Sequence, residues 1–255
     1  MTSLIANSLS AYVLGGSVAT IAAVLTGVHR GLKAQGWPDR DRRTAVRSIA
    51  ALFIFWFLAE LVSVRLGLFR GTTSGIPTIE YGMITPLVVG VVLFWRWRLF
   101  RRVVEAVPQS WMAGVQMFRV EGVIFLVLYA AGKLPGVFAR PAGLGDVVVG
   151  LLAPIVGIAY ARRPQAARDW LRAWNLLGLG DLIVAVTTGF LSSPSRLQMF
   201  AFDNPNKLIG AFPLVMIPVF LVPLAVLLHL ASLKKLRQSE AARAARRLDG
   251  WAHSQ

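Results

Sequence analysis

Residues 49–68 read IAALFIFWFLAELVSVRLGL, a run of 20 residues with only two ionisable side chains, Glu60 and Arg65. A helix of about 20 mostly apolar residues crosses the hydrocarbon of a bilayer, so this stretch predicts a transmembrane helix. Six more stretches have the same character. We predict seven spans, over residues 12–28, 49–68, 83–99, 114–131, 144–160, 171–191 and 208–230.

The composition favours a membrane protein and excludes common soluble classes. Of the 255 residues, 56% are hydrophobic and 15% are charged, whereas soluble domains carry about 25% charged residues. The hydrophobicity also excludes a disordered chain, and the lack of strand-like alternation argues against a transmembrane barrel. We therefore expect an all-α, polytopic membrane helix bundle. Because the chain has no Cys, disulfides and thiolate chemistry are excluded.

The basic residues predict the orientation of the bundle. The chain has 27 Lys and Arg against 12 Asp and Glu. If the N-terminus lies outside, the cytoplasmic segments hold 20 of the basic residues and the outer segments hold 6. This positive-inside asymmetry places the C-terminus in the cytoplasm. Residues 1–233 would form the membrane domain. The basic tail, 234–255, would lie on the inner leaflet as an amphipathic helix or continue the seventh helix.

Topology thus accounts for the net charge of +15, and we predict the lipid bilayer and no nucleic acid as a partner. Trp95, Trp170 and Trp174 near basic residues are typical of the membrane interface. Arg outnumbers Lys 22 to 5, which fits a GC-rich bacterial genome. The predicted location is the inner (plasma) membrane of a bacterium.

Four ionisable residues near the middle of predicted spans are the main candidates for function. Glu60, Glu121 and Asp181 each lie in a span that leads outward, and Arg119 lies about half a turn from Glu121. Each such group costs about 2.5–3.5 kcal/mol on insertion scales, so each needs a partner or a purpose. The functional interpretation is a polar track that binds a proton, an ion or a small solute.

The structural interpretation is a helix lock, in which Arg119 pairs with Asp181 or another acid. Glu121 is a poor partner, because residues two apart do not face each other on a helix. Arg119 could also extend toward the inner interface. The spacing alone does not show whether the three acids meet.

Three further residues are secondary candidates. Trp174 and Thr188 share one face of the sixth span with Asp181, and the small residues between them permit close helix contact. Asp146 is predicted in the first turn of the fifth span, where an acid suits the helix dipole. Its alternative role is an outer gate or a ligand contact.

The remaining residues give no sign of an enzyme or a cofactor. His29 and His229 lie near the predicted cytoplasmic ends of their spans, where they could ligate a haem, but interfacial or packed histidines are commoner. Nucleotide-binding, metalloprotease and serine-hydrolase motifs are missing. We predict no cofactor and no metal.

The sequence favours a small-solute or proton-coupled transporter or channel. The first alternative is a membrane-embedded enzyme that acts on a lipid or quinone. The second is a non-catalytic sensor or assembly factor whose acids only hold helices together.

Overall fold

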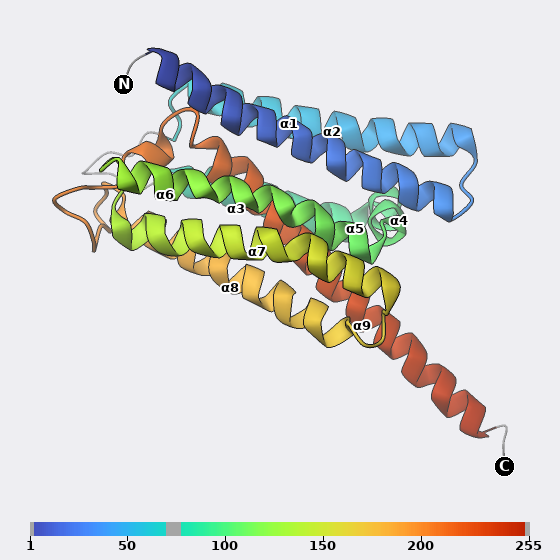
Figure 1. Ribbon diagram of the computed structural model, residues 1–255. Coiled ribbons are helices and arrows are strands. Elements are labelled where there is room, and N and C mark those ends of the chain that lie inside the picture. Colours follow the sequence, from blue (N-terminus) through green and yellow to red (C-terminus); the bar gives the residue numbers. More distant parts are fainter. Residues whose placement is uncertain (1–2, 70–77, 253–255) are drawn as a thin grey trace.

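The computed structural model describes residues 3–69 and 78–252, and the surroundings of side chains in 7–69 and 78–242. Every regular element in the described ranges is a helix (Figure 1). Seven of the described helices are long and apolar enough to cross a membrane, as predicted. By helix length and composition the fold is compatible with a multi-pass membrane protein.

The spans consist of both single and composite helices. The first three are α1 (Ser3–Ala34), α2 (Asp39–Arg65) and α3 (Ile79–Arg96), followed by the short α4 (Arg98–Ala106). The fourth span combines α5 (Gln109–Gly114), the 3-10 helix η1 (Val115–Gly122) and α6 (Val123–Ala130). Then come α7 (Gly136–Arg162), α8 (Arg168–Ser192) and the single turn η2 (Leu208–Gly210). The last span combines the π-helix η3 (Ile217–Leu221) and α9 (Val222–Ala252).

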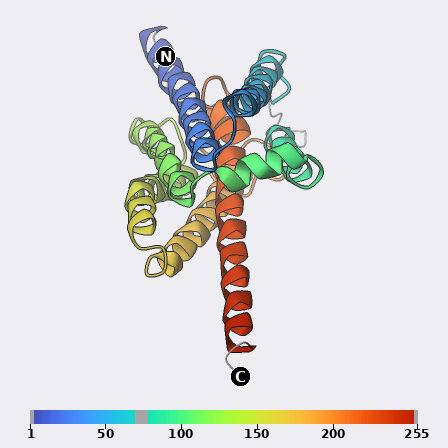
Figure 2. The same ribbon diagram turned by 90° about the vertical axis from the view of Figure 1, so that its right-hand side faces the viewer.

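Helix α9 lies between two groups of helices, which also meet directly where α1 packs on η1 and α5. On one side, α7 packs against η1, α5, α6 and α8, and α8 packs against α9. On the other side, α1 and α2 form a hairpin, and α3 packs along η3 and α9. The end-on view shows α9 passing through the middle of the bundle, with α4 lying across it (Figure 2). Both faces of α9 are therefore available to form sites.

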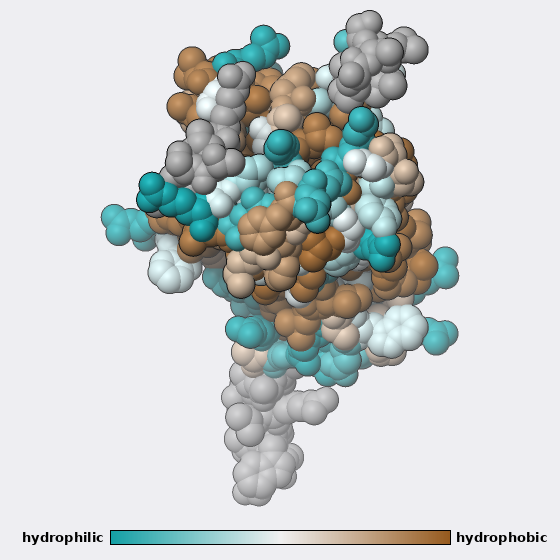
Figure 3. Space-filling view, turned by 90° about the vertical axis from the view of Figure 1, so that its left-hand side faces the viewer, coloured by the Kyte–Doolittle hydropathy of each residue, from teal (hydrophilic) through white to brown (hydrophobic). Residues whose placement is uncertain are grey.

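The outward faces suit a lipid environment. Phe55, Ile183 and Trp95 are each more than 60% exposed although they are large and apolar. At the bundle end that holds the N-terminus, polar side chains gather over the middle and apolar ones lie around them (Figure 3). The core beneath is aromatic, since Phe220 packs on Trp56 and Phe57 with ring centroids 4.6 and 5.2 Å apart. Lipid would cover the exposed apolar faces.

The fifth span begins earlier than predicted, and this moves Asp146. Helix α7 starts at Gly136, directly after Pro135, and continues through Pro141. Asp146 therefore lies in the third turn and not the first, so its predicted role as a first-turn acid is wrong. The Gly and Pro residues before it favour a loop in sequence, but membrane helices tolerate them when neighbouring helices pack closely.

The last span begins later and ends later than predicted. Its helix starts at Ile217, and α9 continues to Ala252, so the tail extends the seventh helix. His229 is the thirteenth residue of the span that begins at Ile217, five residues before the pair Lys234–Lys235, and it is fully buried in the bundle. His29 is exposed on α1, whereas His229 is enclosed by the bundle.

Candidate functional site

Arg119 lies at the centre of a buried ionic cluster in the middle of the bundle. Its side chain is 1% exposed, and it projects from η1 toward α7, α8 and α9. Nε donates to Oδ1 of Asp146 at 2.8 Å, and Nη2 pairs with Oδ2 of Asp181. Nη1 donates to the carbonyl of Gly178 at 3.2 Å and lies 3.3 Å from Nε2 of His229. One guanidinium thus joins three helices to the fourth span.

A hydrogen-bond chain extends from the cluster through His229 and Asn175 to Ser232, where a second donor, Gln109, meets it. Because Arg119 can only donate, Nε2 of His229 accepts, and Nδ1 must carry the proton of the neutral imidazole. Nδ1 then donates to Oδ1 of Asn175 at 2.9 Å. Nδ2 of Asn175 donates to Oγ of Ser232 at 2.9 Å, and Nε2 of Gln109 donates to the same oxygen at 2.8 Å. The chain reaches Gln109, the first residue of α5, at the predicted cytoplasmic end.

Glycines make room for the charged and imidazole side chains. A Cβ atom added at Gly122 would clash with Asp146, one at Gly145 with Asp181, and one at Gly178 with His229. Each glycine lies on a helix next to the one that carries the side chain. The close packing of these helices is therefore what brings the acids to Arg119.

Replacing Gly145 with alanine is expected to displace the carboxylate of Asp181 and to weaken its pair with Arg119. Overpacking of this kind costs about 1–3 kcal/mol, which thermal unfolding in detergent would detect as a lower midpoint. Gly180→Ala is the matched control, because a Cβ at Gly180 of α8 meets no atom within 4 Å. Equal midpoints for the two variants would contradict the proposed packing.

A small cavity borders the cluster on the predicted outer side. Its volume is about 60 Å³, and its lining includes Asp146 and Glu80. Oε2 of Glu80, in the first turn of α3, is buried and has no hydrogen-bond partner among the described residues. A water molecule needs about 10–15 Å³ of such space and two to four polar partners, so this cavity can hold water beside Asp146.

The four main candidates from the sequence do not converge on one place. Arg119 and Asp181 meet, as the structural interpretation expected for this pair. Glu121 lies on the opposite face of η1, where its carboxylate contacts Gly16 of α1. Its Oε2 is buried without a hydrogen-bond partner among the residues described. Glu60 lines a separate cleft between α2 and α9.

Of the three secondary candidates, two contact the ionic cluster and one does not. Asp146 joins the cluster through Arg119. Trp174 is 4% exposed and packs on His229 with ring centroids 5.0 Å apart, so its ring faces the interior of the bundle. The indole of Trp174 donates to the carbonyl of Val149 in α7 at 3.1 Å. Thr188 bonds only to carbonyls of its own helix and does not reach the cluster.

The neutral members of the network were missed in the sequence. Asn175, Ser232 and Gln109 are all buried, and none was a candidate. A signal was present, because Asn175 precedes Gly178 by three residues and therefore lies close to it on the surface of the helix. Likewise, Ser232 follows His229 by three residues. Neutral polar side chains are common in membrane helices, so their type alone does not mark a site.

The charges of the cluster do not cancel. With both aspartates ionised, Asp146 and Asp181 contribute two negative charges against the one positive charge of Arg119, and His229 is neutral in this hydrogen-bond arrangement. Glu80 adds a further acid at the adjoining cavity. An uncompensated charge in a low-dielectric interior is costly, so a proton or a small cation is the natural counter-charge. No group of three or more His, Asp or Glu suited to a metal ion occurs in the described ranges.

Comparison with known proteins locates the cluster within a family. No curated protein and no solved structure matches the chain. A family model described as "Domain of unknown function (DUF8737)" matches residues 76–237, more than half of the chain. Residues 76–237 include Arg119, every side chain to which Arg119 bonds, and the hydrogen-bonded residues as far as Gln109. Glu60 lies before this range. The protein therefore belongs to the family described as domain of unknown function DUF8737.

Proposed function

We propose that this protein is a proton-coupled transporter of the bacterial inner membrane, with the cluster of Arg119, Asp146 and Asp181 as its coupling site. The observation that carries the proposal is the charge balance: two mid-span carboxylates share one guanidinium. The cavity that Asp146 and Glu80 line has room for water on the predicted outer side of the cluster. A proton can therefore reach an acid whose negative charge is not fully compensated.

Uptake of a proton would change the packing of the bundle. A protonated Asp181 no longer forms an ion pair with Arg119, and the contact that joins α8 to η1 weakens. Arg119 then keeps its bonds to Asp146, Gly178 and His229. The two states differ in how firmly the guanidinium holds α8, through Asp181 and Gly178 or through Gly178 alone, and a transporter needs such a pair of discrete arrangements.

The 3-10 helix η1 is a suitable place for this change. Its residues Val115–Gly122 interrupt an otherwise α-helical span between α5 and α6. A stretch of 3-10 helix within a longer helix often marks a hinge, because its hydrogen bonds are less favourable than those of an α-helix. Arg119 is its fifth residue, so a change at the guanidinium acts directly on the hinge.

A helix lock without transport is the second candidate. It is favoured by the complete pairing of the guanidinium, in which Nε, Nη1 and Nη2 all have partners. In this case the protein would be a sensor or an assembly factor. The two candidates differ in whether neutralising one acid abolishes an ion movement or only alters stability.

Proton movement into proteoliposomes distinguishes the two candidates. The full chain is reconstituted with an entrapped pH-sensitive dye, and a potassium diffusion potential is imposed. We expect Asp181→Asn to reduce the initial rate of pH change by at least about tenfold, in the range that loss of a positioned proton carrier produces. Glu121→Gln is the matched control, since this acid lies two residues from Arg119 and faces away from it.

Two results would overturn the transporter proposal. One is a wild-type rate equal to that of protein-free liposomes. The other is an Asp181→Asn rate equal to the wild-type rate in vesicles that contain the same amount of protein. Either result would leave the helix lock as the better account of the cluster.

A further inference from the structure

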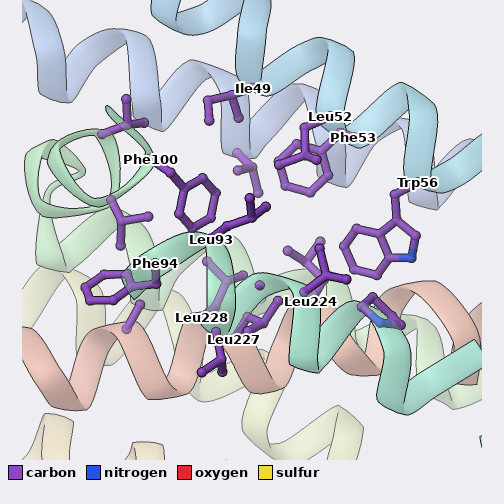
Figure 4. Close-up of a pocket in the computed structure, with 18 of the residues that line it drawn as sticks. Ile49, Leu52, Phe53, Trp56, Leu93, Phe94, Phe100, Leu224, Leu227 and Leu228 are labelled. Atoms are coloured by element: carbon purple, nitrogen blue, oxygen red, sulfur yellow. The ribbon is translucent and has the colours of Figure 1, made fainter. Parts of the chain in front are cut away.

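A second polar group lies on the other side of α9, in a cleft separate from the ionic cluster. The cleft has a volume of about 450 Å³ and is bounded by α2, α3, α4 and α9, with parts of α1 and α5 (Figure 4). In the described part of the chain, α2 and α3 hardly touch each other, since α2 packs on α1 and η3 and α3 packs on α9 and η3. The cleft is therefore accessible sideways from the hydrocarbon.

Aromatic side chains dominate the wall of this cleft. Phe53 and Trp56 lie toward one end and Phe94 and Phe100 toward the other, with Leu227 and Leu228 of α9 between them (Figure 4). Ring faces carry partial negative charge and attract cations. The volume is within the range of about 300–1,000 Å³ that is usual for small-molecule sites.

Glu60 is the acid of the cleft. Its residue exposure is 7%, and it forms no ion pair with any described residue. Trp56 lies one turn earlier on α2, and its indole nitrogen is buried without a hydrogen-bond partner among the described residues. A buried acid without a cationic partner calls for a counter-charge. Neither a lipid chain nor an apolar side chain supplies one.

Lys234 lies at the other end of the cleft and shows that its rings accept a cation. Nζ of Lys234 lies 3.7 Å from the centroid of Phe94. Leu224, near the Glu60 end, and Lys234 are ten residues apart on α9, which corresponds to about 15 Å at 1.5 Å per residue. A bound cation would be repelled by Lys234 and attracted by Glu60. The charged end of a ligand is therefore expected at the Glu60 end of the cleft.

We propose that this cleft binds a lipophilic organic cation, with Glu60 as its counter-ion and Trp56 against its charged end. The apolar body of the ligand lies along Leu224, Leu227 and Leu228. The proposal rests on the proposed transporter function in one respect. It names the class of substrate whose transport would be driven by proton uptake at Asp181.

Helix α9 provides the physical link between the two sites. Leu224, Leu227 and Leu228 line the cleft, whereas His229 and Ser232 face the ionic cluster from the same helix. The helix begins with a π-helical turn, Ile217–Leu221, a feature frequent at functional sites. A ligand that displaces α9 from α2 would alter the bond between His229 and Arg119. Binding on one face can thereby affect the proton site on the other.

The test is binding of tritiated tetraphenylphosphonium to the purified full chain in detergent. We expect saturable binding to wild type and a dissociation constant raised at least about tenfold by Glu60→Gln, the scale of a desolvated cation contact. Glu121→Gln changes a half-buried carboxylate outside this cleft and should bind as wild type does. Triphenylphosphine oxide, which carries similar rings and no charge, should not compete.

A filled cleft provides an independent variant. Leu228→Trp leaves Glu60 in place and should abolish binding, with an unfolding midpoint close to that of wild type as a check on folding. Equal affinity of Glu60→Gln and wild type would overturn the proposal. So would competition by the neutral analogue or displacement by phospholipid alone, because the cleft would then be a site for hydrocarbon.

Failure of this inference and failure of the transporter proposal give different results. If the cation binds through Glu60 but no proton moves, the cleft is a binding site in a protein that does not transport. If Asp181 governs proton movement but tetraphenylphosphonium does not bind, the transporter proposal stands and the substrate class is wrong. Asp181→Asn is expected to keep binding and to lose proton movement.

Discussion

Arg119→Ala is expected to lower the free energy of unfolding by about 3–5 kcal/mol, the cost of removing one partner from a buried ion pair. The variant leaves Asp146 and Asp181 facing each other without the guanidinium that now holds both. It also removes a donor from the carbonyl of Gly178 and from His229. Chemical unfolding of the purified protein in detergent, followed by tryptophan fluorescence, measures the change.

The matched control for this variant is Arg140→Ala. Arg140 lies on the exposed surface near the start of α7 and packs on the ring of Tyr129 at 4.7 Å. Surface substitutions of this kind usually change stability by less than about 0.5 kcal/mol. If the Arg119 and Arg140 variants unfolded at the same denaturant concentration, the cluster would not hold the bundle together.

The number of spans was predictable because long apolar runs have few alternatives in a chain of this composition. The ends of the spans were less predictable. Pro141 and the glycines near Asp146 resemble a loop, and only packing against the fourth span and α8 shows that they lie inside α7. The length of α9 was hidden in the same way, because a basic sequence can form a tail or continue a helix.

The candidate site was predictable in part. Periodicity tells which residues share a face of one helix, so Glu121 was correctly set apart from Arg119. It does not tell how each helix is rotated in the bundle. Glu60 and Asp181 therefore looked equivalent in sequence, although they lie on opposite sides of α9. The role of His229 depends on Asn175, Gly178 and Arg119, which belong to other helices.

The two aspartates are expected to show strong non-additivity in stability. Asp146→Asn or Asp181→Asn alone leaves one carboxylate opposite Arg119 and brings the formal charge of the pair to zero. The amide oxygen of Asn still accepts a hydrogen bond from the guanidinium. The free energy of unfolding of each single variant should therefore equal that of wild type or exceed it. The difference should be about 1 kcal/mol at most, the net contribution of one hydrogen bond.

The double variant Asp146→Asn/Asp181→Asn should lose about 3–5 kcal/mol, because it buries Arg119 without any anion. A double-mutant cycle from unfolding in detergent gives the coupling energy directly. Additive changes would mean that each aspartate acts alone, and the guanidinium would not be shared. Stable single variants are also what separates function from folding: a loss of proton movement in Asp181→Asn then reports the chemistry of the carboxylate, since the fold that holds it is intact.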